Sequence, residues 1–362
     1  MTYQRDNIAA MQGYSWGEQP DDSETLKLNT NENPHPPSPR VAEALANIDA
    51  NALRTYPQPT ADPLRDQLAE LHRVDRSNIV MTHGGDEGLR LAFSTFVEPG
   101  TPFGMAQPSY SLYPVLADVH GSPTLGIAMD DDWQLPRNFA TQLNEAGANL
   151  ACIVNPHAPS GTLLDSERLS RIANEFNGVL LVDEAYVDFV DPALQHDLTR
   201  LISVFDNLLI LRTFSKGYSL AGLRLGYLLG DARLIEPMLT KTRDSYNIDL
   251  ISQHLGAAAI EDRAHAQASW EAVRLARRTL REGLAALGFE VWPSQTNFLL
   301  AKAPMTLSHG AADIYARLKA RGILVRYFNT PQLDDKLRIT VGTETQNAVL
   351  LEALAEILDG QP

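Results

Sequence analysis

Four side chains of different chemistry lie close together in the middle of the sequence. Lys216 lies in the segment Thr213–Tyr218, and Arg224 follows shortly after it. Upstream, Asp183 ends an apolar run and Tyr186 comes soon after it. An amine, a carboxylate, a phenol and a guanidinium in this arrangement predict a site for an electrophile that carries a ring nitrogen and a phosphate.

Pyridoxal phosphate (PLP) is the ligand that matches these groups. Burial disfavours the charged form of a lysine, and the neutral amine of Lys216 could then attack the cofactor aldehyde and later move a proton. Asp183 could pair with the protonated ring nitrogen, because a carboxylate at the end of a buried strand needs a cationic partner. Ordinary explanations stay open here: Lys216 could be a solvated cation, and Asp183 a helix cap or half of an ion pair.

Three further side chains could contact the cofactor ring. Tyr186 could reach its phenolic oxygen, and Asn155, which opens a loop with two prolines and a glycine, could hold the same oxygen from the other side. Tyr110 could stack on the ring face. Taken alone, Tyr186 could equally be a core tyrosine and Tyr110 a loop tyrosine without a special role.

A glycine-rich turn predicts the phosphate site. It follows a predicted strand at residues 78–82 and opens a helix at 86–96, so free N–H groups at the helix start could bind an anion. A plain N-cap by Asp86 is the alternative. Ser215 and Arg224 could close the site from the opposite side. The turn residues assigned to this site are Gly85, Asp86 and Glu87.

Two late arginines, Arg326 and Arg338, are candidates for substrate binding. Arginine suits a two-pronged grip on a carboxylate or phosphate, and both lie in apolar, strand-like segments. Arg338 is the stronger candidate, because an arginine inside an apolar strand requires a matching negative charge. A salt bridge at a domain interface is the alternative.

Composition limits the class of protein. The chain has 362 residues, 44% of them hydrophobic and 21% charged, with a formal net charge of −15. The negative charge argues against a nucleic-acid partner. Cys152, the single cysteine, lies in an apolar run and is expected to be a packed thiol. No secretory signal and no apolar stretch long enough for a membrane helix is visible, so we expect a cytoplasmic protein with no membrane partner.

Near-continuous apolar strands alternate with amphipathic helices through the middle of the chain. The expected strands are 150–154, 179–183, 208–212 and 225–229. Such strands indicate a largely parallel sheet covered on both faces, hence an α/β fold. After about residue 245 the pattern becomes α+β, with a long helix at 269–287, strands at 297–301, 323–326 and 337–341, and a last helix at 345–358. We therefore expect an arm (1–33), a large domain (34–245) and a small domain (246–362).

These residues resemble the fold-type I PLP-dependent aminotransferases of class I and II, and within them the histidinol-phosphate aminotransferase family. The blocks at 213–227 and 337–343 carry the resemblance most specifically, and the blocks at 13–20, 28–34 and 56–57 support it. The resemblance implies a seven-stranded, mostly parallel sheet in the large domain, a smaller α+β domain and a homodimer.

The resemblance also implies roles for individual residues. Lys216 would bind the cofactor covalently and move the proton, Asp183 would pair with the ring, and Tyr110 would stack on it. Tyr186 and Asn155 would hold the phenolic oxygen. The phosphate would be surrounded by Gly85, Asp86, Ser215, Arg224 and, from the neighbouring subunit, Tyr56. The substrate would be met by Tyr14, Arg326 and Arg338, with Arg338 on the carboxylate of glutamate or on a substrate phosphate.

The implied activity is transamination between L-histidinol phosphate and 2-oxoglutarate. The chain departs from the family pattern at His157-Ala158, at His35-Pro36-Pro37 and at Tyr327-Phe328. These positions leave substrate choice open. An aromatic-amino-acid aminotransferase and a threonine-phosphate decarboxylase of the same fold remain alternatives. A PLP-binding regulator without activity is a more remote one, because the acidic chain offers no DNA-binding surface.

Overall fold

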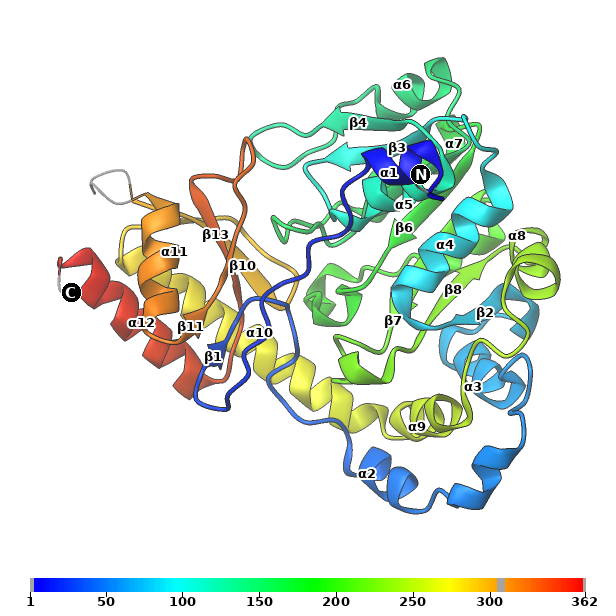
Figure 1. The fold of residues 1–362 in the computed structure, drawn as a ribbon, viewed down its shortest axis with the longest axis horizontal. Helices are drawn as coiled ribbons and strands as arrows, with labels where there is room; N and C mark the ends of the chain where they lie inside the picture. Colours follow the sequence, from blue (N-terminus) through cyan, green and yellow to red (C-terminus); the bar gives the residue numbers. More distant parts are fainter. Residues whose placement is uncertain (1–2, 305–309, 361–362) are drawn as a thin grey trace.

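A seven-stranded sheet forms the centre of the computed structural model, which describes residues 3–304 and 310–360 (Figure 1). The strand order is β2-β8-β7-β6-β5-β3-β4, and β8 alone runs antiparallel to its neighbours. This arrangement confirms the expected fold class. The strands are β2 (Ile79–Thr82), β3 (Phe103–Gln107), β4 (Thr124–Ala128), β5 (Leu150–Val154), β6 (Val179–Asp183), β7 (Leu208–Thr213) and β8 (Gly226–Gly230).

The inner strands β5 and β8 are buried along their whole length, and β3, β6 and β7 are buried except at one residue each, because helices cover both faces of the sheet. Cys152 lies in β5 and is a buried, free thiol, as expected. β4 lies at the edge of the sheet and is mostly exposed. The helices of this part are α2 (Pro39–Ala46), α3 (Asp62–His72), α4 (Gly84–Phe96), α5 (Leu112–His120), α6 (Phe139–Glu145), α7 (Ser166–Glu175), α8 (Ala232–Pro237) and α9 (Leu250–Glu261).

Local sequence signals explain where several helices begin. The Asp165 carboxylate accepts a hydrogen bond from the backbone N–H of Arg168 and caps α7, and Leu169 and Ile172 form the buried face of that helix. Short helical turns connect the larger elements: η1 (Ala50–Arg54), η2 (Arg76–Asn78), η3 (Val187–Phe189), η4 (Pro192–Leu194), η5 (Thr199–Ser203), η6 (Ala221–Leu223) and a π-helical turn, η7 (Met238–Thr242).

A four-stranded antiparallel sheet organises the C-terminal part, in the order β12-β13-β10-β9. Its strands are β9 (Glu290–Val291), β10 (Phe298–Lys302), β12 (Arg326–Tyr327) and β13 (Lys336–Thr340). The long helix α10 (Arg263–Ala286) runs beside this sheet, with α11 (Ala311–Ala320) and α12 (Glu344–Leu358) (Figure 1). β13 presents Arg338 opposite Leu300 of β10 and Arg326 of β12.

Two expectations about element boundaries were wrong. Residues 323–326 form two strands instead of one: β11 (Ile323–Leu324) pairs with β1 (Leu26–Lys27), whereas β12 joins the four-stranded sheet. Each strand finds a different partner, so the chain changes sheets at Val325. Gly84 and Gly85 belong to helix α4 and do not form a separate turn before it, which makes Asp86 a residue of the first helical turn and not the cap.

The N-terminal segment contacts both parts of the molecule. α1 (Asp6–Ala10) lies against α5, where the Asn7 side chain donates to the Asp118 carbonyl at 2.7 Å, and β1 lies beside β11. α9 packs on the large part as well, since a Cβ placed on Gly256 would lie 2.5 Å from Leu225 and 3.1 Å from Leu64. The expected boundary at 245/246 therefore stays a prediction, and we propose instead that the large part extends through α9 to near the start of α10 at Arg263.

Candidate active site

A cavity of about 910 Å³ opens where the carboxyl ends of β5, β6 and β7 face the four-stranded sheet. Most of the residues that the sequence predicted for the site line it. They are Tyr14, Gly85, Asp86, Tyr110, Asp183, Tyr186, Ser215, Lys216, Arg224, Arg326 and Arg338. Asn155, Glu87 and Tyr56 do not line this cavity. The fold thus brings together side chains that are up to 324 positions apart in the sequence, from Tyr14 to Arg338.

Lys216 follows β7 and extends into the cavity. Its Nζ donates a hydrogen bond to the Thr30 carbonyl at 3.0 Å and lies 6.0 Å from the centre of the Tyr186 ring. Burial lowers the pKa of Lys216 to about 8, and the positive charges of Arg338 and Arg224 act in the same direction, while Glu32 opposes them. A substantial fraction of this amine is therefore neutral near pH 8, which is the form that attacks an aldehyde or accepts a proton.

Asp183 ends β6 and is 4% exposed. Its Oδ2 accepts a hydrogen bond from the Tyr113 hydroxyl at 2.8 Å, and its Oδ1 accepts one from the Ala185 N–H at 3.0 Å. Burial raises the pKa of Asp183 to about 6 although both hydrogen bonds lower it. Within the described residues no cation lies within ion-pair distance of this carboxylate. A buried carboxylate in this setting suits a cationic ligand.

Tyr113 is a site residue that the sequence analysis missed. It is fully buried at the start of α5, and its ring lies 5.5 Å from that of Tyr110 in an edge-to-face arrangement. Its position three residues after Tyr110, in an apolar helix, is typical of a core tyrosine. Nothing in the local sequence indicates that its hydroxyl reaches Asp183, 70 residues away.

The end of the cavity predicted to bind phosphate is formed by the first turn of α4 and by Arg224. Arg224 has a left-handed backbone (φ 55°), and its Nη1 donates to Ser215 Oγ at 3.4 Å and to the Ala221 carbonyl at 2.9 Å. Its Nη2 lies 3.6 Å from Asp86 Oδ2. Gly84 permits this close approach, because a Cβ there would lie 2.6 Å from the guanidinium.

The structure does not support the predicted cofactor contact of Glu87. Its carboxylate turns back to accept the His83 N–H and also accepts from Asn247 Nδ2 at 2.9 Å. This carboxylate therefore satisfies the start of helix α4 instead of facing the cavity.

Asn155 also lies outside the cavity wall. It is fully buried, and its amide exchanges two hydrogen bonds with the backbone of Leu164, at 2.8 and 3.1 Å. One amide hydrogen remains uncommitted, so a contact with a cofactor oxygen stays a prediction. Tyr186 is better placed, since it lines the cavity and its hydroxyl accepts a hydrogen bond from Asn31 at 3.0 Å.

Tyr110 and Tyr14 stand edge to face across the cavity, with ring centres 5.8 Å apart. Burial raises the pKa of Tyr110, and the nearby carboxylate of Asp86 contributes to the increase. Tyr110 is therefore a neutral phenol throughout the physiological range, which suits a role in stacking rather than in proton transfer.

Arg326 and Arg338 both lie close to the Phe328 ring. Their guanidinium carbons are 5.3 and 5.5 Å from its centre, and that of Arg338 also lies 5.3 Å from Phe298. Arg338 Nη2 donates to the Asn29 carbonyl at 2.9 Å, whereas its Nε is buried without a hydrogen-bond partner. Within residues 3–304 and 310–360 neither arginine forms an ion pair. The alternative that Arg338 serves in a salt bridge at a domain interface is therefore wrong.

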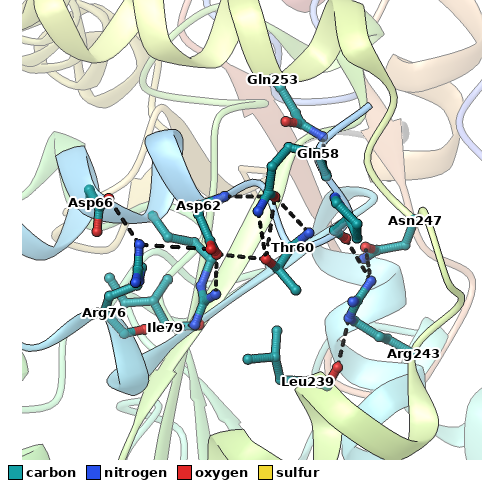
Figure 2. A network of polar contacts seen from close by, with 12 residues as sticks. Gln58, Thr60, Asp62, Asp66, Arg76, Ile79, Leu239, Arg243, Asn247 and Gln253 are labelled. Carbon is teal, nitrogen blue, oxygen red and sulfur yellow. Dashed lines mark hydrogen bonds and ion pairs between the residues drawn. The ribbon is translucent and has the colours of Figure 1, made fainter. Parts of the chain in front are cut away.

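Tyr56 lies on the outer surface of the chain, 78% exposed, and stacks on Tyr246 with ring centres 4.4 Å apart. Figure 2 shows the polar network that holds the loop after it. The Gln58 carbonyl accepts from Gln253 at 2.9 Å, and the Pro59 carbonyl accepts from Arg243 Nη1 at 2.9 Å. The network holds the backbone of the loop that follows Tyr56.

His157, a departure from the family pattern, is a buried structural residue. Its Nδ1 lies 2.7 Å from Ser160 Oγ and its Nε2 lies 3.0 Å from the Pro108 carbonyl. Burial lowers its pKa to about 4, so the ring is neutral at physiological pH. It joins the loop after β5 to the loop that carries Tyr110.

Comparison with known proteins identifies the family. The model of the family "Aminotransferase class I and II" matches residues 23–354. The chain belongs to the aminotransferase class I and II family.

Relatives within this family are similar over their full length. The chain is 40% identical to histidinol-phosphate aminotransferase 1 of Trichormus variabilis, covering 98% of this chain and 99% of that protein. It is 41% identical to the histidinol-phosphate aminotransferase of Chromohalobacter salexigens, with 95% of each chain covered. The crystal structure of the Sinorhizobium meliloti histidinol-phosphate aminotransferase, a complex with pyridoxal-5′-phosphate, superimposes with a TM-score of 0.90 at 23% identity over 99% of this chain and 98% of that one.

The residues present in the cavity fit the cofactor of this family. Asp183 is a buried carboxylate that lacks a cation, which a protonated pyridine nitrogen would supply. Lys216 offers an amine whose pKa is lowered toward neutrality. Arg224, Ser215 and the start of α4 offer donors for a phosphate. Among the described residues, no helix is long and apolar enough to span a bilayer.

Proposed function

We propose that this aminotransferase exchanges an amino group between L-histidinol phosphate and 2-oxoglutarate, giving imidazole-acetol phosphate and L-glutamate in histidine biosynthesis. The observation that carries the proposal is the pair Arg326 and Arg338, two guanidinium groups without ion-pair partners among the described residues, which face the same cavity as Lys216. Two cations suit a substrate phosphate, and one of them suits the carboxylate of glutamate. The relatives that cover the whole chain bear the same activity in their names.

Residues of the large part would hold the cofactor. Asp183 would keep the ring nitrogen protonated, with Tyr113 orienting its carboxylate. Tyr186 and Asn155 would hold the phenolic oxygen, and Tyr110 would cover one face of the ring. Bound in this way, PLP supplies an electrophilic aldehyde and an electron-accepting ring. The phosphate would lie among Gly85, Asp86, Ser215 and Arg224, with Tyr56 of a neighbouring subunit completing the site.

Lys216 would carry the covalent attachment and the proton transfer. Once the substrate amine displaces it, its Nζ is free to take the proton from the substrate Cα. A pKa of about 8 places this amine close to physiological pH, where the neutral and charged forms are both populated. The Thr30 carbonyl, 3.0 Å away, holds Nζ on the side of the cavity where Arg338 lies.

Arg338 would bind the α-carboxylate of glutamate or the phosphate of histidinol phosphate, and Arg326 would assist with the phosphate. Its unpartnered Nε gives Arg338 a free donor beside the Nη groups, as a two-pronged contact requires. Tyr14 would lie against the substrate side chain. The proposal includes a homodimer, which the exposed Tyr56 supports, and a cytoplasmic location; it includes neither nucleic acid nor membrane as a partner.

A substrate comparison tests this function. Purified holoenzyme is assayed with 2-oxoglutarate and, separately, histidinol phosphate, phenylalanine and phosphothreonine. The proposal predicts the highest kcat/KM for histidinol phosphate, with glutamate as a product. A higher value for phenylalanine would assign an aromatic aminotransferase, and release of carbon dioxide from phosphothreonine would assign a decarboxylase. PLP binding without transfer from any amino donor would indicate a regulator.

A further inference from the structure

A second large cavity, of about 1010 Å³, lies apart from the candidate active site. Its walls come from the end of α3, from the segment 187–203 and from the N-terminal half of α10 (elements labelled in Figure 1). None of the predicted cofactor or substrate residues lines it. Its volume is comparable to that of the first cavity, so a small metabolite fits inside it.

Most of the charged side chains along this cavity are already paired. Arg212 Nη2 lies 2.8 Å from Glu184, Arg274 Nη2 lies 2.6 Å from Glu271, and Arg200 Nε lies 3.3 Å from Asp197. Within each pair the two opposite charges neutralise one another, so these residues attract a charged ligand only weakly. A ligand would therefore be selected by the charged groups that have no such partner.

Among the charged side chains of the cavity wall that are not exposed, one cation and one anion lack an ion-pair partner within the described residues; Arg73 and Asp75, which also lack one, are exposed. Arg263 contacts no carboxylate within 4 Å, and its Nε is buried without a hydrogen-bond partner. Asp188 accepts no hydrogen bond and forms no ion pair, although Arg263 and Arg212 are near enough to influence it. A buried guanidinium nitrogen and a carboxylate left in this state carry a desolvation cost that a ligand could remove.

Apolar and aromatic surface completes the cavity. The Arg263 guanidinium stands 5.5 Å from the centre of the Trp270 ring, and the side chains of Val190 and Ile202 contribute to the wall. This surface can contact an apolar or aromatic group next to the two charges.

We propose that this cavity binds a free α-amino acid with an apolar or aromatic side chain. The carboxylate would pair with Arg263, the ammonium group with Asp188, and the side chain would lie against Trp270 and Val190. The opposite charges of Arg263 and Asp188 select a zwitterion, because a simple anion would meet the Asp188 carboxylate and a simple cation would meet Arg263.

The position of Asp188 links this cavity to the candidate active site. A Cβ on Gly217 would lie 2.1 Å from Asp188 Oδ2, so the carboxylate packs on the backbone next to Lys216. Trp270 Nε1 donates to the Gly217 carbonyl at 2.7 Å. A ligand that engages Asp188 and Trp270 therefore contacts the two groups that hold Gly217, and its binding should shift the visible absorbance of the cofactor attached at Lys216.

Titration calorimetry of the holoenzyme tests the proposal with three probes of similar size. α-Methyl-L-phenylalanine carries both charges and has no Cα hydrogen, so the enzyme cannot turn it over. 3-Phenylpropanoate carries only the carboxylate and 2-phenylethylamine only the amine. An Arg338→Leu background removes the carboxylate grip of the first cavity. Arg263→Gln and Asp188→Asn remove the proposed contacts, and Arg200→Gln, whose side chain is 83% exposed on the rim, is the matched control.

We expect the zwitterion to bind about tenfold more tightly than either fragment, and Arg263→Gln or Asp188→Asn to weaken it by about tenfold or more, as the loss of a charged hydrogen bond implies. Arg200→Gln should change its Kd by less than about twofold. Equal binding of the three probes, unchanged binding in Arg263→Gln, or a Kd no tighter than about 10 mM in every protein would overturn the proposal. Turnover of histidinol phosphate, measured with wild-type holoenzyme in which Arg338 is present, tests the proposed function separately.

Discussion

Replacing Tyr113 by Phe probes the electrostatics of the candidate active site with the loss of one oxygen atom. The Tyr113 hydroxyl donates to Asp183 Oδ2 at 2.8 Å in a fully buried setting, and this bond stabilises the charged carboxylate. A hydrogen bond to a charged group is worth about 1.5–3 kcal/mol, and one pKa unit corresponds to about 1.4 kcal/mol. The substitution should therefore raise the pKa of Asp183 from about 6 by roughly one to two units.

The higher pKa of Asp183 in Tyr113→Phe should change how the affinity for PLP depends on pH. PLP needs the ionised carboxylate, so the cofactor-free protein must lose a proton to bind it below the pKa of Asp183. In the wild type the affinity should fall below about pH 6, and in Tyr113→Phe it should fall below roughly pH 7 to 8. At higher pH the two affinities should converge, because the missing hydrogen bond is absent both before and after the cofactor binds.

The assay is a fluorescence titration of cofactor-free protein with PLP between about pH 5 and 9, a window that spans the Asp183 pKa. Protonation of PLP itself affects both proteins equally and cancels in the comparison. Tyr227→Phe is the control, because its buried hydroxyl contacts His72 at 2.9 Å and not Asp183. Superimposable pH curves for Tyr113→Phe and the wild type would refute the assignment of Asp183 as the ring partner.

Four other substitutions, two of them combined in one experiment, test the substrate site and the site shared between subunits. Arg338→Lys keeps the positive charge but loses the two-pronged guanidinium contact, so KM for glutamate should rise about 10- to 100-fold with the cofactor absorbance unchanged. An unaltered KM would contradict the role of Arg338 in substrate binding. Phe328→Leu removes the ring that both Arg326 and Arg338 contact, and steady-state KM for histidinol phosphate should rise roughly 2- to 30-fold. Tyr56→Ala and Lys216→Ala proteins, each inactive alone, should regain activity when unfolded and refolded together; no recovery would argue against sites shared between subunits.

The sequence allowed much of the large sheet to be predicted, because its strands are buried on both faces. β5 and β6 occupy the residues expected from their continuous apolar runs. The change of sheet at Val325 could not be predicted in this way, since two adjacent short strands and one longer strand have the same apolar pattern. Their separate partners, β1 and β13, are set by tertiary packing alone.

The candidate site also contains residues that could be predicted from the sequence and residues that could not. Lys216, Asp183 and Arg224 could be found from the sequence because reactive groups in apolar or glycine-rich contexts are unusual. Tyr113 could not, since its hydroxyl matters only through a contact made across 70 residues. Glu87 lies in the same segment as the predicted anion site, but its carboxylate accepts the backbone N–H of the cap residue His83 and the side-chain amide of Asn247.

The central claim is that Lys216 holds the cofactor covalently, and one experiment addresses it directly. The holoenzyme is reduced with borohydride, digested, and mapped by mass spectrometry. The account predicts that the mass of the reduced cofactor is found on the peptide containing Lys216, with loss of the visible absorbance band, and that Lys216→Ala protein carries no such addition. A label on another lysine, or none at all in protein that has bound PLP, would contradict it.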